Sequence, residues 1–306
     1  MSVADGPLRG QRAVVTGAGK GLGRAYALYL AGQGARVLVN NRRHDGQSDA
    51  ETSAQQTVDE IRAAGGEAYA NWCDVSHPHS GLQLQADLME KLGGVDIVVA
   101  NAGIDKASSF AKQSMADFRA VFDTSFFGNL NLVHAIWPQL LGQGYGRVVL
   151  TTSSAGLYAN HGQSAYSAAK AAVIGLMRAL ALEGLRQGIR VNAIAPYGYS
   201  QMTAPYLQES MAQLFDPQCV APLVGWLASP ACNCSGEVLV SGAGFMRRAE
   251  TTESEALPLD AGQLESLLAQ LRGMPRHAYD SASASFSQFL DEIKPSPEKS
   301  VRPAQS

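Results

Sequence analysis

Two kinds of hydrophobic pattern alternate between Gln11 and Val240. Seven short runs are rich in valine, isoleucine and leucine, with the almost unbroken apolar character of strands that are covered on both faces. These expected strands lie at residues 12–17, 35–40, 66–74, 95–103, 146–154, 189–196 and 236–242, of which 66–74 has the weakest pattern. Segments with apolar residues at helical spacing separate them, and we expect helices at Leu22–Gln33, Asp49–Ala64, Gly81–Leu92, Ala116–Leu141, Ser164–Arg186 and Pro217–Leu227.

This alternation of strands and helices predicts an α/β fold of the Rossmann type. The expected architecture is a doubly wound, seven-stranded parallel sheet with right-handed crossovers. Such a sheet binds its ligands beyond the carboxyl ends of the strands. We therefore expect a single domain over residues 8–246 that contains the whole functional site.

The pattern changes after Met246. Residues 247–306 are polar and poor in aromatic residues, and we expect a partly helical, partly disordered extension here, not a second domain. Amphipathic helices are expected at Gly262–Leu271 and Ser285–Ile293, and the last dozen residues are expected to be disordered. The apolar side of the first helix needs a surface to cover, so the extension is expected to fold over the binding cleft or over a partner subunit.

A glycine-rich turn, Val14–Arg24 (VVTGAGKGLGR), joins the first expected strand to the first expected helix. In this context Gly17 permits a tight exit from the strand, Gly21 lets the backbone approach a pyrophosphate, and Gly23 allows helix and sheet to pack closely. Leu22 belongs to the same turn and begins the helix, whose free N–H groups and positive dipole end favour an anion. The turn therefore predicts a dinucleotide site.

The end of the second expected strand, VLVNNRR, bears on which dinucleotide binds. Proteins that bind NAD usually place an acidic residue here, on the ribose 2′-hydroxyl. This chain has Asn41, followed by Arg42, whose guanidinium can hold a 2′-phosphate through charge-assisted hydrogen bonds. Lys20, on the adjoining glycine turn, adds a second cation. We predict NADP as the cofactor and NAD as less favoured, the alternative being that Lys20 and Arg42 are solvated surface charges.

Composition and charge argue against several other classes of protein. The 306 residues carry a net charge of −3, and 17% are charged, so nothing indicates a nucleic-acid or membrane partner. The N-terminus lacks an apolar signal core and no apolar run reaches membrane-spanning length, so we expect a cytoplasmic protein. The six histidines suggest no metal cluster. The four cysteines fit neither zinc-ribbon spacing nor a secreted disulfide framework, so ordinary reduced thiols are expected: Cys73, Cys219, Cys232 and Cys234.

Three residues near the fifth expected strand can carry out proton transfer. Tyr166 and Lys170 are spaced i, i+4 and share one helical face, and Ser153 lies at the end of the preceding strand. A ketone that is being reduced accumulates negative charge on its oxygen and needs a proton there. A tyrosine hydroxyl can donate that proton when a neighbouring ammonium eases its ionisation. We assign Tyr166 as the proton donor, Lys170 as the ammonium and Ser153 as the residue that positions the substrate oxygen.

Together these motifs resemble the short-chain dehydrogenase/reductase family over Leu8–Phe245. The resemblance rests on the glycine turn with Thr16, the NAG motif at 101–103, the YSAAK motif at 166–170 with its serine, and VNAIAP at 191–196. It implies further cofactor contacts: Asp74 and Val75 at the adenine ring, Asn101, Ala102 and Gly103 along the cofactor cleft, Thr203 at the pyrophosphate, and Tyr166 and Lys170 at the nicotinamide ribose.

The resemblance also concerns the substrate pocket and the oligomer. Tyr158, Asn160 and His161 fall where family members line the substrate pocket, although a lone histidine such as His161 is more often an ordinary loop residue. A homodimer or homotetramer is expected, with the helices Ala116–Leu141 and Ser164–Arg186 at the interface.

Within the family, residues 166–184, 201–207 and 220–245 resemble the (3R)-hydroxyacyl-CoA dehydrogenase unit of peroxisomal multifunctional β-oxidation enzymes and single-domain bacterial relatives. The first hypothesis is therefore an NAD(P)(H)-dependent oxidoreductase that transfers a hydride between NADPH and a ketone or secondary alcohol, with 3-oxoacyl-CoA and 3-hydroxyacyl-CoA as the substrate pair. A steroid or polyketide-type ketone is a close alternative. A catalytically idle NADP-binding structural subunit is the alternative from another class, and the intact Ser153, Tyr166 and Lys170 set argues against it.

Two positions depart from the family pattern. Ser125 stands where many members carry an asparagine that takes part in a proton relay to solvent. Pro196 is followed by Tyr197 where a glycine is usual, so the side chain is expected to reshape the nicotinamide or substrate side of the cleft.

Overall fold

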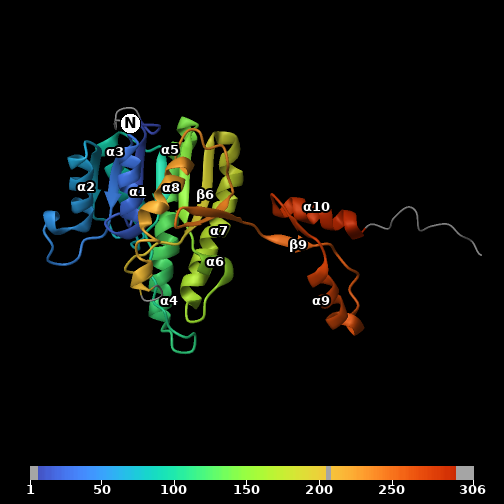
Figure 1. Cartoon of the computed structure of the whole chain (residues 1–306). Helices are drawn as coiled ribbons and strands as arrows, with labels where there is room; N and C mark the ends of the chain where they lie inside the picture. Colours follow the sequence, from blue (N-terminus) through green and yellow to red (C-terminus); the bar gives the residue numbers. More distant parts are fainter. Residues whose placement is uncertain (1–5, 205–207, 294–306) are drawn as a thin grey trace, which may run out of the picture. The chain divides into compact units, whose positions relative to one another are not determined.

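The valine-rich runs form one sheet with the strand order β3-β2-β1-β4-β5-β6-β7-β8 (Figure 1). Seven of its strands are parallel, as the sequence predicts. They are β1 (Arg12–Thr16), β2 (Arg36–Asn40), β3 (Glu67–Asn71), β4 (Ile97–Ala100), β5 (Gly146–Thr151), β6 (Ile189–Pro196) and β7 (Val238–Gly242). The computed structural model describes residues 6–204 and 208–293, so the expected disorder of the last dozen residues concerns a segment outside the described ranges.

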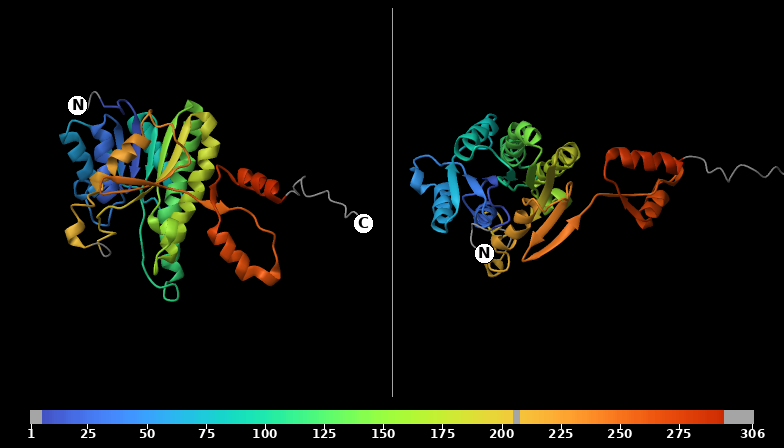
Figure 2. Two further views of the ribbon diagram at one scale, coloured as in Figure 1. Left: turned by 45° about the vertical axis from the view of Figure 1, so that its right-hand side comes forward. Right: turned by 90° about the horizontal axis from the view of Figure 1, so that it is seen from above.

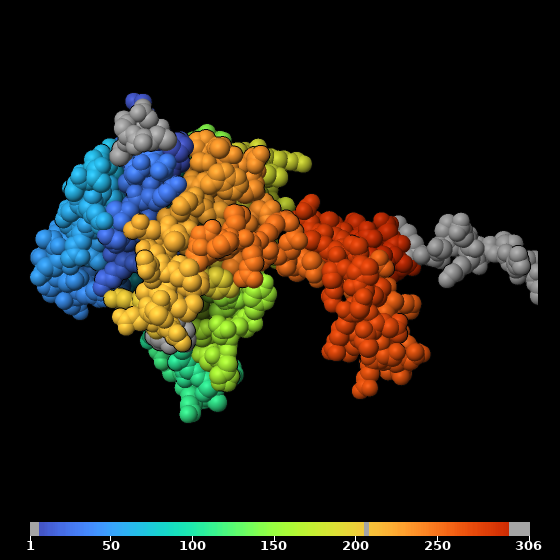
Figure 3. Space-filling view, viewed as in Figure 1, coloured from blue at the N-terminus to red at the C-terminus, as the bar shows by residue number. Residues whose placement is uncertain are grey.

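An eighth strand, β8 (Phe245–Ala249), was not expected from the sequence. Ala243 and Gly244 connect it to β7, with φ angles of 52° and 79°. Two consecutive residues with positive φ are typical of a tight β-hairpin, so β8 runs antiparallel to β7. The hairpin and the helix α8 (Ala221–Leu227) are coloured in the orange range in Figure 3. The sheet is therefore mostly parallel with one antiparallel edge strand.

Helices cover both faces of the sheet (Figure 2). Helix α1 (Gly21–Gly32) contacts both α2 (Ser53–Ala63) and α8 (Ala221–Leu227), while α3 (Ser80–Leu92) packs on α5 (Gly128–Gln143). Helix α7 (Ser164–Gly184) packs against β5 and β6. Short helical turns complete the chain: η2 (Asp49–Glu51), η4 (Leu185–Gln187), η5 (Glu209–Met211), η6 (Pro217–Cys219) and η7 (Ala261–Gln263).

The helix expected at Ala116–Leu141 is divided in the structure. It consists of α4 (Met115–Phe122), the π-helical segment η3 (Asp123–Phe127) and α5. The segment between β5 and α7 also forms a short helix, α6 (Ser154–Tyr158), which was not expected. Single π-helical turns within α-helices are frequent at functional sites.

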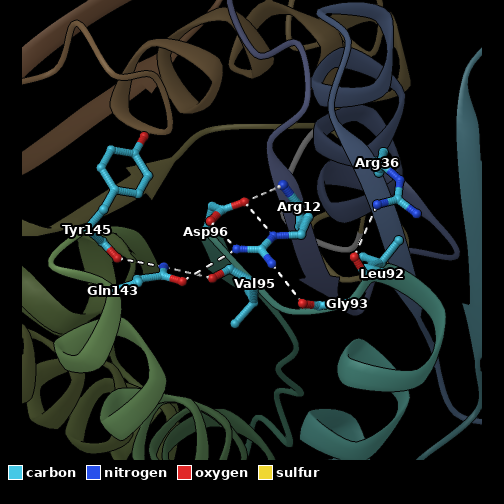
Figure 4. A network of polar contacts seen from close by, with 8 residues as sticks. All are labelled: Arg12, Arg36, Leu92, Gly93, Val95, Asp96, Gln143 and Tyr145. Carbon is cyan, nitrogen blue, oxygen red and sulfur yellow. Dashed lines mark hydrogen bonds and ion pairs between the residues drawn. The ribbon is translucent and has the colours of Figure 1, made fainter.

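A polar network fixes the edge of the sheet where the parallel strands begin (Figure 4). The Arg12 guanidinium donates to both carboxylate oxygens of Asp96, with N–O distances of 2.8 and 2.7 Å. The same carboxylate accepts the Arg12 backbone N–H at 2.9 Å, and its hydrogen bonds raise the pKa of Arg12. Gln143 donates to the Val95 carbonyl at 3.0 Å. The network joins β1 to the start of β4 and leaves the opposite edge for ligands.

The chain divides into two compact units, Met1–Arg248 and Ala249–Ser306. The second unit contains a two-stranded antiparallel sheet of β9 (Thr252–Ser254) and β10 (Arg276–Ala278), which was not expected, and the helices α9 (Leu264–Gly273) and α10 (Ala282–Ile293). Both helices lie within a few residues of the predicted positions. No residue of this unit is fully buried in its described part, 249–293.

Candidate active site

The glycine turn between β1 and α1 is held in a conformation that favours glycine at two positions. Gly17 and Gly21 have φ angles of +63° and +52°. A Cβ atom at Gly17 would lie 2.9 Å from the Ala102 Cα, and one at Gly23 would lie 2.3 Å from the Gly17 carbonyl oxygen. The turn is therefore packed as tightly as its three glycines predict, and residues with side chains would open it.

Hydrogen bonds from the segment after β4 hold the glycine turn in place. The Asn101 side chain donates to the Thr16 carbonyl at 3.0 Å, and the Thr16 hydroxyl accepts the backbone N–H groups of Asn101 and Ala102 at 3.0 and 3.1 Å. Asn101 and Ala102 thus lie beside the turn, where the sequence places them, and Asn101 acts first of all as a brace for it.

The beginning of helix α1 fits a phosphate group. Within the described ranges, no side chain caps its N-terminus and its first turn has no acidic residue. A Cβ at Gly21 would lie 3.2 Å from the Ser200 Cβ, and Lys20 is exposed beside it. Uncapped N–H groups, a positive dipole end and a nearby ammonium together suit a dinucleotide pyrophosphate.

The loop after β6 lies against the same turn. A Cβ at Gly198 would come within 2.9 Å of the Leu22 side chain. The Thr203 hydroxyl donates to the Gly198 carbonyl at 2.7 Å and accepts the Ser200 N–H at 2.8 Å. Thr203 thus belongs to a loop that reaches the glycine turn. Tyr197, which replaces the usual glycine, is 36% exposed.

The end of β2 gathers the groups expected to select the nucleotide. The Asn41 amide donates to the Ser53 hydroxyl at 3.0 Å, and a Cβ at Gly19 would lie 2.2 Å from that hydroxyl oxygen. Arg42 Nη1 lies 3.8 Å from Asp74 Oδ2. The Arg42 side chain is 55% exposed and the Asp74 side chain 45% exposed. Ser53, at the start of α2, lies at this site, although no motif in the sequence indicates it.

Asp74 is held in its ionised form. Burial raises the pKa of this carboxyl, but hydrogen bonds from Ser76 and the charge of Arg42 outweigh burial, so the net effect lowers it. The hydroxyl and the N–H of Ser76 donate to Asp74 Oδ1 at 2.7 and 2.9 Å.

Val75, the next residue, is buried, and a Cβ at Gly128 would lie 2.9 Å from its side chain. Arg43 stacks on Trp72 at 4.5 Å and pairs with Asp49.

The catalytic candidates stand at the carboxyl end of β5 and on the first turns of α7. Ser153 caps α6, and its hydroxyl oxygen accepts the Ala155 N–H at 3.1 Å. Helix α6 packs along α7, which carries Tyr166 and Lys170. The Lys170 ammonium lies 5.8 Å from the centre of the Tyr166 ring. The predicted i, i+4 pairing on one helical face is therefore present.

Lys170 is a fully buried cation, only 2% exposed. Its ammonium donates to the Thr151 carbonyl at 2.8 Å, and burial lowers its pKa to about 8. Close packing requires two glycines here. A Cβ at Gly156 would lie 2.7 Å from the Lys170 carbonyl carbon, and one at Gly103 would lie 3.2 Å from the Lys170 ammonium. Gly156 carries no motif signal of its own in a single sequence.

Ser125 occupies the π-helical segment η3 and is fully buried. Its hydroxyl accepts the Ile104 N–H at 3.0 Å and donates to the Ile104 carbonyl at 3.1 Å. A Cβ at Gly103 would lie 3.3 Å from the same hydroxyl. The Ser125 carbonyl accepts the Asn129 amide at 2.9 Å. Ser125 therefore ties η3 to the segment that passes beside the Lys170 ammonium.

The end of α6 and the loop that joins it to α7 contain the expected substrate residues. Tyr158, Asn160 and His161 are all exposed. The Asn160 amide donates to Gln163 Oε1 at 2.8 Å, and Gln163 in turn donates to Asp105. This chain of side chains, which the sequence did not reveal, joins the loop to the segment after β4.

Comparison with known proteins decides the family. The model of the short chain dehydrogenase family matches residues 11–210, about two thirds of the chain. The chain belongs to the short-chain dehydrogenase family. It is therefore an oxidoreductase that acts on CH–OH or C=O groups, and this family uses NAD(P). No cluster of three or more potential metal ligands occurs in residues 6–204 and 208–293.

Curated relatives fall into three groups. A short-chain type dehydrogenase/reductase of Mycobacterium tuberculosis is 40% identical over 77% of this chain and 83% of its own length. The peroxisomal multifunctional enzyme type 2 of Drosophila melanogaster is 40% identical over 80% of this chain, which spans only 41% of that enzyme. A 3-oxoacyl-[acyl-carrier-protein] reductase of Synechocystis is 37% identical over 72% of this chain and 90% of its own.

Solved structures confirm the fold of this dehydrogenase. A short chain dehydrogenase from Mycobacterium avium superposes with a TM-score of 0.78 at 36% identity, covering 89% of this chain and 98% of the other. A 7α-hydroxysteroid dehydrogenase in complex with NADH and 7-oxo glycochenodeoxycholic acid gives 0.70 at 32% identity, covering 80% and 98%. A Beutenbergia cavernae protein with bound NADP also gives 0.70 at 32% identity, covering 78% and 97%. In the described residues, no helix is both long and apolar enough to cross a membrane.

Proposed function

We propose that this dehydrogenase transfers a hydride from NADPH to the 3-oxo group of an acyl-CoA, and in the reverse direction oxidises a 3-hydroxyacyl-CoA. The observation that carries the proposal is the buried Lys170 ammonium beside Tyr166 on α7, next to Ser153 at the end of β5. A buried ammonium beside a tyrosine is costly in a structural role but suits proton transfer at a carbonyl oxygen.

In this proposal each of the three side chains has a separate task. NADPH supplies the hydride when bound. The Ser153 oxygen accepts the Ala155 N–H, and its hydroxyl proton is proposed to donate to the substrate oxygen and so position it. Tyr166 donates its proton to the same oxygen as negative charge develops there. Lys170 stabilises the resulting phenolate.

The proposed cofactor site follows the carboxyl ends of β1, β2, β3 and β4. Its phosphate-binding part is the uncapped start of α1 with Lys20, and its nucleotide-selecting part is the end of β2. The residues proposed to contact NADP are Gly17, Lys20, Gly21, Leu22, Gly23, Asn41, Arg42, Asp74, Val75, Asn101, Ala102, Gly103, Tyr166, Lys170 and Thr203. We place the functional domain at residues 8–246 and the extension at 247–306.

The acyl-CoA substrate is favoured by the relatives. Their names include multifunctional peroxisomal enzymes and 3-oxoacyl reductases. A steroid ketone is the second candidate, because a structural relative holds a 7-oxo bile acid conjugate. The homodimer or homotetramer and the cytoplasmic location expected from the sequence remain predictions. A catalytically idle subunit remains the alternative from another class.

A substrate panel tests the proposal. Oxidation of NADPH is measured with acetoacetyl-CoA, a longer 3-oxoacyl-CoA and a 7-oxo steroid, using the Tyr166→Phe variant as the control for the chemistry. We expect kcat/KM for a 3-oxoacyl-CoA to exceed that for the steroid at least tenfold. A higher value for the steroid would exchange the two candidates. Binding of NADPH without turnover on any ketone would establish the idle-subunit alternative.

A further inference from the structure

The loop between α8 and β7 contains a pair of cysteines that the hydride-transfer site does not use. The Sγ atoms of Cys232 and Cys234 lie 3.5 Å apart, within hydrogen-bonding distance of each other. Cys232 is 1% exposed, Cys234 is half-buried, and both are free thiols. The loop is bound to the beginnings of the strands, because the Gly236 N–H donates to the Val191 carbonyl near the start of β6. It therefore lies at the sheet edge opposite the Ser153 and Tyr166 site.

Two arginines anchor this loop and place positive charge beside the thiols. Arg147, at the start of β5, is 7% exposed, and its Nε donates to the Ser229 carbonyl at 3.0 Å. Arg190, at the start of β6, donates to the Asn233 carbonyl at 3.2 Å. The Asn192 amide donates to the Cys234 carbonyl at 3.0 Å. The loop is thus held by side chains from two neighbouring strands, with its two sulfur atoms together.

The charges around the pair favour one thiolate. A hydrogen bond from the Cys234 thiol, opposed by burial and assisted by Arg147 and Arg190, lowers the pKa of Cys232 to about 7. The pKa of Cys234 is raised, because its proton is held by Cys232 and because the negative charges of Cys232 and Glu237 oppose a second ionisation. Tyr145, whose ring lies 4.5 Å from the Arg147 guanidinium, completes the surroundings. These surroundings therefore favour the loss of one of the two thiol protons.

We propose that Cys232 and Cys234 form a reversible redox site that hydrogen peroxide converts to an intramolecular disulfide. Because Cys232 is only 1% exposed, peroxide reaches it when the loop opens locally. The Cys232 thiolate then attacks one peroxide oxygen and the O–O bond breaks. Hydroxide leaves and takes up a proton from solvent, and Cys232 becomes a sulfenic acid. The Cys234 sulfur then attacks the Cys232 sulfur, the S–S bond forms, the S–O bond breaks and water leaves with the Cys234 proton. The dithiol is oxidised by two electrons, and one peroxide is reduced to two waters.

The spacing of the pair makes this disulfide easy to reduce again. One residue separates the two cysteines, so the disulfide closes a small ring that stores strain. Strained disulfides have more oxidising potentials and are the labile ones. A small thiol reductant should therefore restore the dithiol, which fits a reversible site and not a structural crosslink.

The other two cysteines provide controls in the same chain. Burial, together with Asp74 and Asp87, raises the pKa of Cys73 to about 11, so this thiol should react slowly. Cys219 is exposed on η6 and tests whether simple accessibility decides the reaction. If exposure alone mattered, Cys219 would be oxidised before the pair.

The experiment treats the reduced full chain with hydrogen peroxide at neutral pH, alkylates the remaining thiols and measures the intact mass and the cysteine peptides. We expect the loss of two hydrogens without added oxygen, protection of Cys232 and Cys234 from alkylation, and recovery with dithiothreitol. Cys219→Ser should behave as the wild type. Cys234→Ser should stop at a sulfenic acid that dimedone traps on Cys232.

Two further measurements on the wild type test the redox site even if a cysteine variant folds poorly. The oxidation rate of the wild type should rise through about pH 7 and level off above it, and Arg190→Gln should move this rise to higher pH. Phenylarsine oxide, which binds paired thiols, should block the oxidation. Oxygen addition at Cys219 ahead of the pair, a disulfide between chains, or a pair that stays fully alkylatable would overturn the proposal. Each result is independent of ketone reduction.

Discussion

At the scale of single residues, Lys170 combines burial with charge, and this combination makes folding depend on pH. Burial lowers the pKa of Lys170 to about 8 in the folded chain, whereas an exposed lysine in the unfolded chain keeps a value near 10.4. Between these two values the unfolded chain binds a proton that the folded chain does not. The contribution of Lys170 to stability therefore increases as the pH rises through this window.

Replacement of Lys170 by methionine isolates this effect. Relative to Lys170→Met, the wild type should gain about 2–3 kcal/mol in free energy of unfolding between pH 7 and pH 10, at 1.36 kcal/mol for each pKa unit. Urea unfolding of both proteins at several pH values measures the difference. Parallel pH profiles would mean that the ammonium is solvated and not buried.

We predict that Asn41 and Arg42 decide the choice between NADPH and NADH. Each charge-assisted contact to the 2′-phosphate contributes on the order of 1.5–3 kcal/mol, less where the side chain is as exposed as Arg42. We expect kcat/KM to favour NADPH roughly a hundredfold, at 1.4 kcal/mol per decade. Asn41→Asp with Arg42→Ala should reverse this preference, mainly through the KM for NADPH.

Arg43→Ala is the matched control for this change. It removes the same charge from the neighbouring position, but Arg43 is already engaged by Trp72 and Asp49. This variant should keep the NADPH preference within a few-fold. A wild type that prefers NADH would show that Arg42 and Lys20 are surface charges only.

The sequence predicts how the proposed catalytic residues are arranged better than it predicts their surroundings. The i, i+4 spacing of Tyr166 and Lys170 follows from the helical repeat, so their common face could be foreseen. The contact between Arg42 and Asp74, the bond of Asn41 to Ser53 and the packing of Gly156 on Lys170 join segments far apart in the chain. No local pattern encodes those distances.

At the scale of elements, η3 separates α4 from α5 beside Lys170. The sequence predicts one helix there, because the apolar spacing continues through the π-helical turn without a proline or a glycine to mark it. Ser125 forms two hydrogen bonds with Ile104 at this turn. We therefore assign Ser125 as a positioning residue for the segment beside Lys170.

Ser125→Ala tests this assignment. We expect kcat to fall about tenfold, equivalent to about 1.4 kcal/mol, with KM for NADPH little changed, since the lost bonds fix η3 and not the nucleotide. Thr124→Ala is the control, because the Thr124 hydroxyl donates locally, to the Ala120 carbonyl of the adjoining α4 at 3.1 Å. Equal losses in the two variants would contradict a specific role for Ser125.

At the scale of the whole molecule, the parallel sheet was predictable and its last strand was not. Seven apolar runs separated by helices determine the doubly wound topology. The exposed β8 has no apolar alternation to mark it, and it exists because the Ala243–Gly244 turn returns the chain beside β7. The strands β9 and β10, three residues each, are too short to give a pattern.

The second unit is the part of the molecule whose apolar side chains most need a partner surface. None of its described residues, 249–293, is fully buried, and Leu268, Phe286 and Ile293 are each more than half exposed. A chain that ends at Arg248 should therefore show a several-fold higher KM for the ketone or a smaller oligomer. Steady-state kinetics and light scattering measure these effects, and an unchanged enzyme would refute the role predicted for the extension.

The central claim is that Tyr166 protonates a ketone while NADPH reduces it. The direct measurement is ketone-dependent NADPH oxidation by the wild type and by Tyr166→Phe, with the Kd for NADPH determined for both. We expect a loss of at least about a hundredfold in kcat, in the range of general acid catalysis, with the Kd unchanged. If Tyr166→Phe keeps more than a few per cent of the activity, another group supplies the proton and the assignment of this site is wrong.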